Sequence, residues 1–517
     1  MRLAVACRCA TRESDPERAT IRHGEQTGMD GMISFGAKLA QHARHQPDHP
    51  AVSMGAETIN YAGLHRLSNR IARGLALRGV KAGDLVTVGL PNCIGFVAAC
   101  YGIWKLGATP QPVSFRLPKG ELQAIVDLAR APLVVGLFEQ GVSQPVVTAD
   151  QLAALSDDDS DLPDAVPAIS KAPTSGGSTG RPKLILSGQP GLSPEETPEV
   201  SGFRLRPDDI ALLPAPLYHN APFGVMMNAT QLGAHLVLTA RFDPEGTLTE
   251  IAARKATWLY LVPTMMTRIW RLPEATRARY DVGTVLILWH MAAPCPAWLK
   301  EAFIHWFSGG EVMELYAGTE AQAVTIITGS EWLTHRGSVG QVSVGEMKVF
   351  GEDGRELPPG EVGEIFMRRA EGTPETYHYL GATPKVLAGG WESLGDLGRF
   401  DEAGYLYLAD RRSDMILVGG SNVYPAEIEA ALEEHESVQS CAVIGLPDED
   451  LGNRIHAIVN VKGTVTSEQL AEHLKDRLVT YKRPRSFEFV DDPVRDDAGK
   501  VRRTALRDAR IAAAASA

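Results

Sequence analysis

The sequence predicts an α/β protein with a large, layered α/β N-terminal domain and a small α+β C-terminal domain. Its 517 residues are too many for one compact core, so two or more domains are expected. Up to about residue 410, helical patterns alternate with short β-branched runs, which indicates helices layered on a sheet. Beyond residue 411, a remainder of about 100 residues is the size of a small domain. We therefore expect domains at 31–411 and 412–517.

The elements of the large domain follow in a regular order. Residues 1–30 mix charges without sustained periodicity, so we expect a disordered extension rather than a targeting signal. Residues 61–80 have apolar positions at helical spacing and precede the strand-like LVTVGL at 85–90. A helix is expected at 94–105, before the strand-like PLVVGLF at 132–138. The stretch IGFVAACYGIW in that helix is about half as long as a bilayer requires, so it indicates a buried helix.

The small domain begins with a different pattern. Residues 404–435 predict a strand, a charged joint at 411–414, a second strand, a Gly-Gly turn and a helix. Pro425 suits the first helical position, where no backbone donor is lost. Thr466 and Gln469 form a candidate capping box for a further helix, one face of which would carry Leu470, Leu474 and Leu478. We place the domain boundary in the charged joint.

The composition is that of a soluble globular protein, with 44% apolar and 22% charged residues. A formal net charge of −12 argues against nucleic acid or an anionic membrane as the main partner, because such partners select a basic face. An anionic ligand in a local pocket is still compatible with it. The six cysteines form no C-x-x-C pair, so neither a disulfide framework nor a zinc site is indicated, and a cytoplasmic location is expected.

A loop rich in glycine and hydroxyl side chains lies at residues 173–184, PTSGGSTGRPKL. Glycine allows turns that direct successive backbone N–H groups at one point, and the hydroxyls and Lys183 add donors and a charge. Such a loop suits a triphosphate, although Walker A spacing is absent. Pro182 disfavours helix at Arg181 and a strand-like run follows, so we expect the loop to join two strands. A flexible Ser/Gly linker is the alternative.

Four further stretches accompany this loop. ELYAGTEA, at 314–321, places an aromatic ring, a hydroxyl and a carboxylate close together; SLGDLGRFDEAGYLYLADRRSD, at 393–414, carries an aspartate between glycines and an arginine after a strand. GGSNVYPAEIEAAL follows, and AGKVRRTALR lies near the end of the chain. In this order the motifs resemble the acyl-adenylate-forming (AMP-binding) superfamily, in its acyl-CoA synthetase branch. The resemblance covers the chain from about residue 35 onward and implies a C-terminal domain that rotates on a hinge.

The resemblance implies a role for each matching residue. Tyr316 would stack on adenine, Thr319 would bind the α-phosphate and Glu320 would coordinate Mg²⁺. The motif MAAP would supply the adenine strand through Ala292, Ala293 and Pro294. The ribose would be bound by Asp396 and Arg411. The glycine-rich loop would hold the pyrophosphate part of ATP through Thr174, Ser175, Gly176, Gly177, Ser178, Thr179, Gly180 and Lys183.

Lys500, in the last motif, would be a catalytic lysine. A carboxylate and an α-phosphate must meet, and a cation between them offsets their repulsion and the charge that develops in the transition state. The motif departs from the family upstream, where VRDDA replaces the usual Pro and Thr. For the second step the small domain would swing away, and the turn at Gly419 and Gly420 would line a tunnel for the pantetheine arm of CoA. The hinge position, normally Asp or Lys, is Ser413, which can still absorb changes in φ and ψ.

The motif PAPLYHNAPFG, at 214–224, resembles the one whose histidine gates the acyl pocket, which gives His219 a catalytic role. It offers no aspartate for a substrate ammonium, which favours an acid without an α-amine. Gly318 would leave space where a side chain would otherwise project toward the acyl tail, so we infer a roomy apolar pocket. The residues expected to border the acid are His219, Asn220, Phe223, Trp289, His290, Met291 and Gly318.

The leading hypothesis is an AMP-forming acid–CoA ligase that uses ATP, Mg²⁺ and CoA. The motifs look most like ligases of bile-acid or steroid side chains, with fatty acids and aryl acids as further possibilities. A stand-alone adenylating enzyme that loads a carrier protein, and a catalytically silent nucleotide-binding homologue, are the alternatives. The expected partners are small molecules, with a homodimer as a candidate assembly and neither nucleic acid nor stable membrane insertion.

Overall fold

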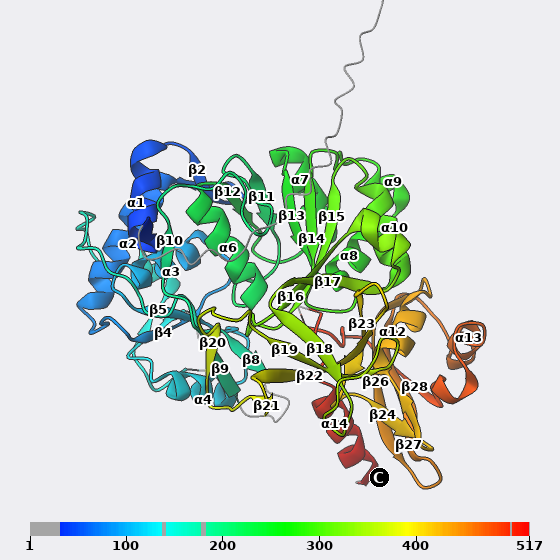
Figure 1. Cartoon of the computed structure of the whole chain (residues 1–517). Coiled ribbons are helices and arrows are strands. Elements are labelled where there is room, and N and C mark those ends of the chain that lie inside the picture. Colours follow the sequence, from blue (N-terminus) through cyan, green and yellow to red (C-terminus); the bar gives the residue numbers. More distant parts are fainter. Residues whose placement is uncertain (1–30, 137–140, 177–181, 497–498, 516–517) are drawn as a thin grey trace, which may run out of the picture.

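The computed structural model describes residues 31–136, 141–176, 182–496 and 499–515 (Figure 1). The predicted N-terminal extension, 1–30, lies outside the described residues. In the part of the chain that is described, no helix is both long enough and apolar enough to cross a membrane. The predicted α/β class is confirmed, because helices and strands alternate through most of the chain.

A long sheet, of 14 strands in the described residues, forms the centre of the large domain. Its middle strands pair in parallel and its two ends are antiparallel. The middle strands are short apolar runs because both their faces are covered. The order is β18 (Glu346–Phe350), β19 (Gly363–Arg368), β22 (Trp391–Phe400), β23 (Leu406–Arg411), β17 (Ser338–Val344), β16 (Val324–Thr328), β15 (Glu311–Ala317), β14 (Ile287–His290), β13 (Trp258–Leu261), β11 (Ile210–Leu213), β12 (His235–Leu238), β2 (Pro50–Met54) and β3 (Glu57–Asn60), with β21 (Lys385–Leu387) on β22.

Smaller sheets complete the large domain. A parallel sheet has the order β5 (Thr109–Pro112), β4 (Leu85–Gly89), β6 (Val134–Gly136) and β7 (Val146–Val147). An antiparallel sheet has the order β20 (Tyr377–Leu380), β9 (Pro182–Ser187) and β8 (Thr174–Gly176). A short antiparallel pair joins β1 (Met32–Ser34) to β10 (Leu192–Pro194). The predicted strand–loop–strand arrangement at 173–184 is therefore confirmed, with Pro182 at the start of β9.

Helices cover the sheets of the large domain. The helix expected at 94–105 is α3 (Ile94–Trp104), which is buried on nearly every side and packs between α2 and the parallel sheet. The helix expected within 61–80 is α2 (Tyr61–Ala76), capped by Asn60. The others are α1 (Phe35–His45), α4 (Lys119–Ala129), α5 (Ala149–Leu152), α6 (Asn220–Leu232), α7 (Pro244–Arg254), α8 (Pro263–Trp270), α9 (Glu274–Arg277), α10 (Ala297–Trp306) and α11 (Gly329–Thr334).

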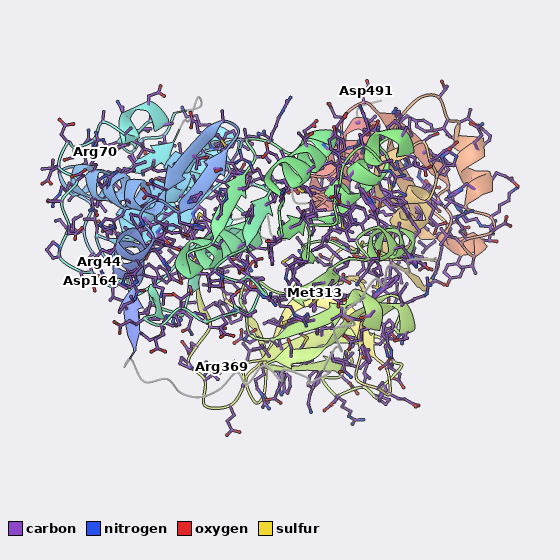
Figure 2. The ribbon with its side chains drawn as sticks, turned by 90° about the horizontal axis from the view of Figure 1, so that it is seen from above. Arg44, Arg70, Asp164, Met313, Arg369 and Asp491 are labelled. Carbon is purple, nitrogen blue, oxygen red and sulfur yellow. The ribbon has the colours of Figure 1, made fainter. Side chains whose placement is uncertain are left out.

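The C-terminal region has a hydrophobic core of its own, formed by residues between Ile416 and Phe487. It contains the pair β24 (Ile416–Val418) and β25 (Ser421–Val423), and a sheet of β26 (Val438–Asp448), β27 (Gly452–Val461) and β28 (Ser486–Val490). Its helices are α12 (Pro425–Glu433), α13 (Ser467–His473), the short 3₁₀ helix η1 (Thr480–Lys482) and α14 (Arg503–Ala515). Seen from above, the first helices and this region lie at opposite ends of the molecule (Figure 2).

Two details of the small domain test the sequence analysis. Pro425 occupies the first turn of α12, and Thr466 forms the predicted capping box with Gln469. The helix that follows is shorter than expected, because it ends before Leu474 and the chain continues in turns. Leu474 and Leu478 nevertheless enter the core, since a backbone hydrogen bond between them continues the helical spacing.

Candidate active site

Three residues that the sequence analysis assigned to the nucleoside lie together. The hydroxyl of Tyr316, at the end of β15, donates to Asp396 Oδ2 at 2.8 Å, and Arg411 Nε donates to Asp396 Oδ1 at 3.2 Å. Asp396 and Arg411 are register partners on β22 and β23, which fixes their spacing. Burial and the Asp396 carboxylate raise the pKa of Tyr316 well above its usual value, so the hydroxyl stays protonated. The three side chains form one connected polar edge.

A second group surrounds Glu320. This carboxylate is buried, 3.5 Å from Lys183 Nζ, and accepts a hydrogen bond from the hydroxyl of Tyr379 on β20. The Lys183 ammonium also lies over the Tyr379 ring, 4.1 Å from its centre, and donates to its hydroxyl at 3.1 Å. Thr376 Oγ1 donates to the backbone oxygen of Glu320 at 2.7 Å. Lys183 and Glu320, which are distant in sequence, thus meet as the sequence analysis requires.

The tip of the glycine-rich loop lies outside the described residues. Gly177, Ser178, Thr179 and Gly180 belong to that part, so their assignment to phosphate stays a prediction. The strands on either side are described: Thr174 pairs with Leu184, Ser175 with Lys183 and Gly176 with Pro182. The two strands therefore bring both ends of the loop to the side chain of Lys183, beside Glu320.

The loop that carries Lys500 is docked against the large domain. Two hydrogen bonds between Asp496 and Lys500 close the loop. The backbone N–H of Asp496 donates to the Lys500 carbonyl at 2.9 Å, and the backbone N–H of Lys500 donates to Asp496 Oδ1 at 2.8 Å. Gly499 is buried with φ +76°, and a Cβ atom there would be 3.3 Å from Thr264 and 3.4 Å from Ala293. A glycine is therefore required to seat this loop on the predicted adenine strand.

The charged residues that shift the pKa of Lys500 belong to both regions of the chain. Desolvation and the guanidinium of Arg411 lower the pKa of Lys500, and the carboxylates of Asp496, Glu320 and Asp396 partly offset them. Lys500 therefore lies within electrostatic reach of the nucleoside residues and of Glu320, although it comes from the C-terminal region. The side chain itself is exposed.

A buried carboxylate holds both flanks of the Lys500 loop. Glu429, on α12, is 2% exposed and accepts from Arg495 at 2.7 Å, from Arg503 at 2.7 Å and from the backbone N–H of Val443 at 2.8 Å. Arg503 also donates to Asp414, at the predicted hinge, at 2.7 Å. Desolvation opposes ionisation of Glu429, but the two arginines outweigh it and lower its pKa. Sequence analysis missed this cluster, because no local motif marks it.

The segment predicted as the adenine strand, 291–294, follows β14 as a bend rather than as a strand, and its backbone is strained at one position. Ala292 has φ +78°, where a side chain costs roughly 1–2 kcal/mol. The following Ala293 contacts the Lys500 loop through Gly499. Ala292 and Pro294 are exposed, so the edge of this segment is open to a ligand. Strain of this kind is held in place only where the surrounding packing over-determines the backbone.

The residues expected to border the acid divide into two groups. His219, Asn220 and Gly318 are half-buried, and His219 is the N-cap of α6. Phe223 and Trp289 are fully buried: Phe223 packs edge-on against Phe96 and Trp104, and the Trp289 indole donates to a backbone oxygen, that of Phe203.

His290 and Met291 are also buried. His290 Nδ1 lies 4.0 Å from Glu314, and burial lowers the pKa of His290 to about 4. The side chains of Phe223, Trp289 and His290 pack in the core, and their assignment to the border of the acid stays a prediction. Alternate residues of a strand or helix point to opposite sides, and a motif match does not tell which side faces the ligand.

Gly318 has no space for a side chain. A Cβ atom at this position would be 2.2 Å from Leu394 Cδ1 and 2.8 Å from Glu320 Oε2. The space that a side chain at position 318 would need is occupied by Leu394 and Glu320. Gly318 therefore gives no support to a roomy pocket, which stays a prediction.

The turn at Gly419 and Gly420 joins β24 to β25 and is exposed, with φ +53° and +83°. A Cβ atom on Gly419 would lie 3.2 Å from Leu451, and the Leu451 backbone oxygen accepts from the N–H of Gly419 at 2.9 Å. Leu451 also belongs to the C-terminal region. A role in a CoA tunnel stays a prediction, and it requires a different orientation of that region.

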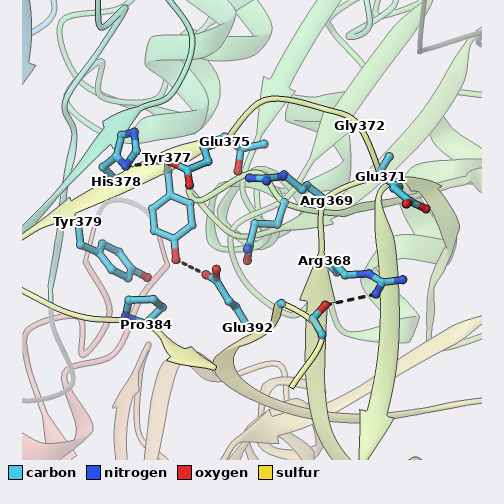
Figure 3. A pocket seen from close by; sticks show the side chains of 15 residues that line it. Arg368, Arg369, Glu371, Gly372, Glu375, Tyr377, His378, Tyr379, Pro384 and Glu392 are labelled. Carbon is cyan, nitrogen blue, oxygen red and sulfur yellow. Dashed lines mark hydrogen bonds and ion pairs between the residues drawn. The ribbon is translucent and has the colours of Figure 1, made fainter. Parts of the chain in front are cut away.

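A large cavity of about 640 Å³ opens beside the Glu320 group (Figure 3). Tyr377 and Tyr379 point into it from β20, and the Tyr377 hydroxyl donates to Glu392. Sequence analysis missed Thr376, Tyr377 and Tyr379. The alternation TYHY at 376–379 is a strand signal that could have found them, but only the pairing of β20 with β9 brings them to Lys183.

Comparisons with known proteins agree with this geometry. The family described as AMP-binding enzyme matches residues 39–378, and the AMP-binding enzyme C-terminal domain matches residues 427–500. Feruloyl-CoA synthase of an Amycolatopsis species is 31% identical, over 92% of this chain and 98% of its own. The long-chain-fatty-acid–CoA ligase FadD13 of Mycobacterium tuberculosis is 30% identical, over 92% of this chain and 98% of its own.

The fold has solved counterparts. The o-succinylbenzoate CoA synthetase of Bacillus subtilis, in complex with an acyl-adenylate intermediate, matches with a TM-score of 0.76 and 24% identity, covering 92% of this chain and 98% of that one. The chain therefore belongs to the AMP-binding enzyme family, in its acyl-CoA synthetase branch of AMP-forming acid–thiol ligases.

Proposed function

We propose that this enzyme activates a bulky, largely apolar carboxylic acid, such as a bile-acid or steroid side chain or a fatty acid, as an acyl-adenylate. It then transfers the acyl group to CoA. The reaction is carboxylate + ATP → acyl-AMP + pyrophosphate, followed by acyl-AMP + CoA → acyl-CoA + AMP. Acid–CoA ligases among the relatives, one of them for long-chain fatty acids, support this proposal.

One observation carries the proposal: the Lys500 loop is seated on the predicted adenine strand, within electrostatic reach of Glu320, Asp396 and Arg411. We propose that this loop brings the Lys500 ammonium to the point where the substrate carboxylate and the α-phosphate of ATP would meet. A preorganised cation stabilises the charge that develops in the transition state, because it needs no reorganisation during the reaction.

Glu320 fits the proposed role toward Mg²⁺. Among the described residues no group of three or more His, Cys, Asp or Glu side chains could hold a metal ion by itself, and the buried carboxylate of Glu320 is the protein ligand that we propose. Mg²⁺ commonly binds through one or two carboxylates together with phosphates and water. When bound, Mg²⁺ would neutralise phosphate charge, while Lys183 and Tyr379 orient the Glu320 carboxylate.

A second, smaller cavity supports a phosphate-bearing second substrate such as CoA. It has a volume of about 180 Å³ and lies between the loop at 214–218, α8 and Asp496 of the Lys500 loop. Arg116, Arg241 and Arg268 line it together with Phe115 and Phe242. Arginine is well suited to phosphate, because its planar donors match phosphate oxygens in pairs.

The experiment is a half-reaction assay. The protein is incubated with ATP, Mg²⁺ and a panel of acids graded by size and ring content, and pyrophosphate and AMP are followed with and without CoA. CoA-dependent AMP formation with bulky acids is the expected result. AMP formation that requires a carrier protein instead of CoA would indicate the carrier-loading alternative. Absence of pyrophosphate with every acid would contradict the proposal.

A further inference from the structure

One face of α6 is not covered by the core. Half-buried residues recur on it at helical spacing, at Asn220, Ala221, Gly224, Met227 and Asn228. The residues between them, including Phe223, are fully buried. Figure 1 shows the helix between the first helices and the middle strands of the long sheet. It begins next to His219, the predicted gate for the acid.

The side chain of Lys171 reaches the start of this face. Its backbone is held between two strands of the large domain, since the Ala172 N–H donates to Pro110 and the Lys171 carbonyl accepts from Ser187. Its ammonium donates to Asn220 Oδ1 at 2.7 Å. A Cβ atom on Gly224 would lie 4.0 Å from Lys171 Nζ, with no other atom that close. Because position 224 is a glycine, no side chain from it covers the ammonium.

The ammonium of Lys171 has no counter-ion in the described part of the chain, and Asn220 is the one side chain to which it donates there. Burial lowers the pKa of Lys171 to about 8, and a buried cation without an anionic partner is energetically costly. Lys105 provides the contrast. Burial lowers its pKa to about 7, but it donates to Ser68 Oγ at 2.7 Å and to Asn69 Oδ1 at 2.6 Å, with a further bond to a backbone oxygen.

We propose that Lys171 and Asn220 form a binding site for a second carboxylate on the acid substrate, at the start of the half-buried face of α6. The site rests on the proposed function and on the expectation that Asn220 borders the acid. The ammonium has donors left for an anion, and the Asn220 amide can donate as well. An acid whose apolar body carries a second carboxylate would supply the counter-ion that the protein itself does not. This narrows the proposed substrates from apolar acids in general to dicarboxylic acids.

The test compares each dicarboxylic acid with its monomethyl ester. The ester keeps the length and shape of the diacid but loses one negative charge. A panel of aliphatic and ring-bearing diacids, each paired with its ester, is assayed by pyrophosphate release, and the ratio of kcat/KM for diacid over ester is the readout. For the preferred pair we expect a ratio of about 10–100 in the wild-type enzyme, the range of one charge-assisted hydrogen bond.

Two variants remove the site in different ways. Lys171→Met removes the charge at nearly constant volume, and Asn220→Asp supplies an internal counter-ion beside the ammonium, which keeps the variant testable if Lys171→Met does not fold. Both should bring the ratio close to 1. Lys105→Met is the matched control, since it also removes a buried lysine, and it should leave the ratio unchanged.

The outcomes separate the two proposals. A wild-type preference for the esters, or a ratio that neither variant changes, overturns the carboxylate site while the ligase function stands. Equal loss of activity toward diacids and esters in the Lys171 variant also overturns it, because Lys171 would then only hold Asn220 in place. If no acid of either kind releases pyrophosphate, the proposed function itself fails.

Discussion

Arg271 ties the two domains together in the orientation that seats Lys500. It lies at the C-terminal end of α8, and its guanidinium donates to two backbone oxygens at the end of α12 and just beyond it, those of Glu433 at 2.9 Å and His435 at 3.3 Å. The guanidinium of Arg271 is partly removed from water, and this desolvation lowers its pKa. We predict that Arg271→Ala weakens this orientation and slows adenylation.

The magnitude follows from the kind of contact. A hydrogen bond to a charged group contributes about 1.5–3 kcal/mol, and recovered hydration of the guanidinium offsets part of that. A net loss of roughly 1.5 kcal/mol changes the balance between domain orientations about tenfold. Single-turnover pyrophosphate release should therefore fall by up to about tenfold, while thioester formation from pre-formed acyl-adenylate should not fall.

Arg502→Ala is the matched control. Arg502 also crosses between the domains, but its ion pair with Glu121, at 3.2 Å, is largely exposed. Such pairs contribute about 0–1 kcal/mol, so pyrophosphate release should change by about twofold or less. The reasoning would be refuted if Arg271→Ala slowed both half-reactions equally, or if Arg502→Ala had the larger effect on adenylation.

Three further predictions concern the C-terminal region. Lys500→Ala should abolish most adenylation but spare thioester formation from supplied acyl-adenylate, and equal losses in both would contradict this division. Gly420→Leu should slow thioester formation from supplied acyl-adenylate and spare adenylation. Gly452→Leu, at another open turn with positive φ, is the control for backbone strain. Equal effects of the two substitutions on thioester formation would show that Gly420 does not line the CoA path. Because Glu429 has a lowered pKa in the folded state, its contribution to stability is present above a pH of about 4.5 and is lost as pH falls further. Urea unfolding from pH 7 to 3 should show this slope in the wild type and a weaker slope in Glu429→Gln.

Local signals in the sequence predicted much of the fold. The loop between β8 and β9, the buried helix α3, Pro425 at the start of α12 and the capping box at Thr466 all depend on residues within a few positions of one another. Such features are set by backbone preferences and by short-range hydrogen bonds, which a single sequence displays directly. The end of α13 was misjudged, because apolar spacing continued past the last helical residue.

The sequence by itself determined which chemical groups are present: a glycine-rich loop with one lysine, an aromatic–hydroxyl–carboxylate motif and a lysine near the end of the chain. Only the tertiary structure decided which of them meet. Strand pairing brought Tyr379 to Lys183 and Glu320, and side-chain direction sent Phe223 and Trp289 into the core. Packing also left Lys171 beside Asn220 without a counter-ion among the described residues. These outcomes depend on contacts between residues far apart in the chain, and no local pattern records which faces will be buried.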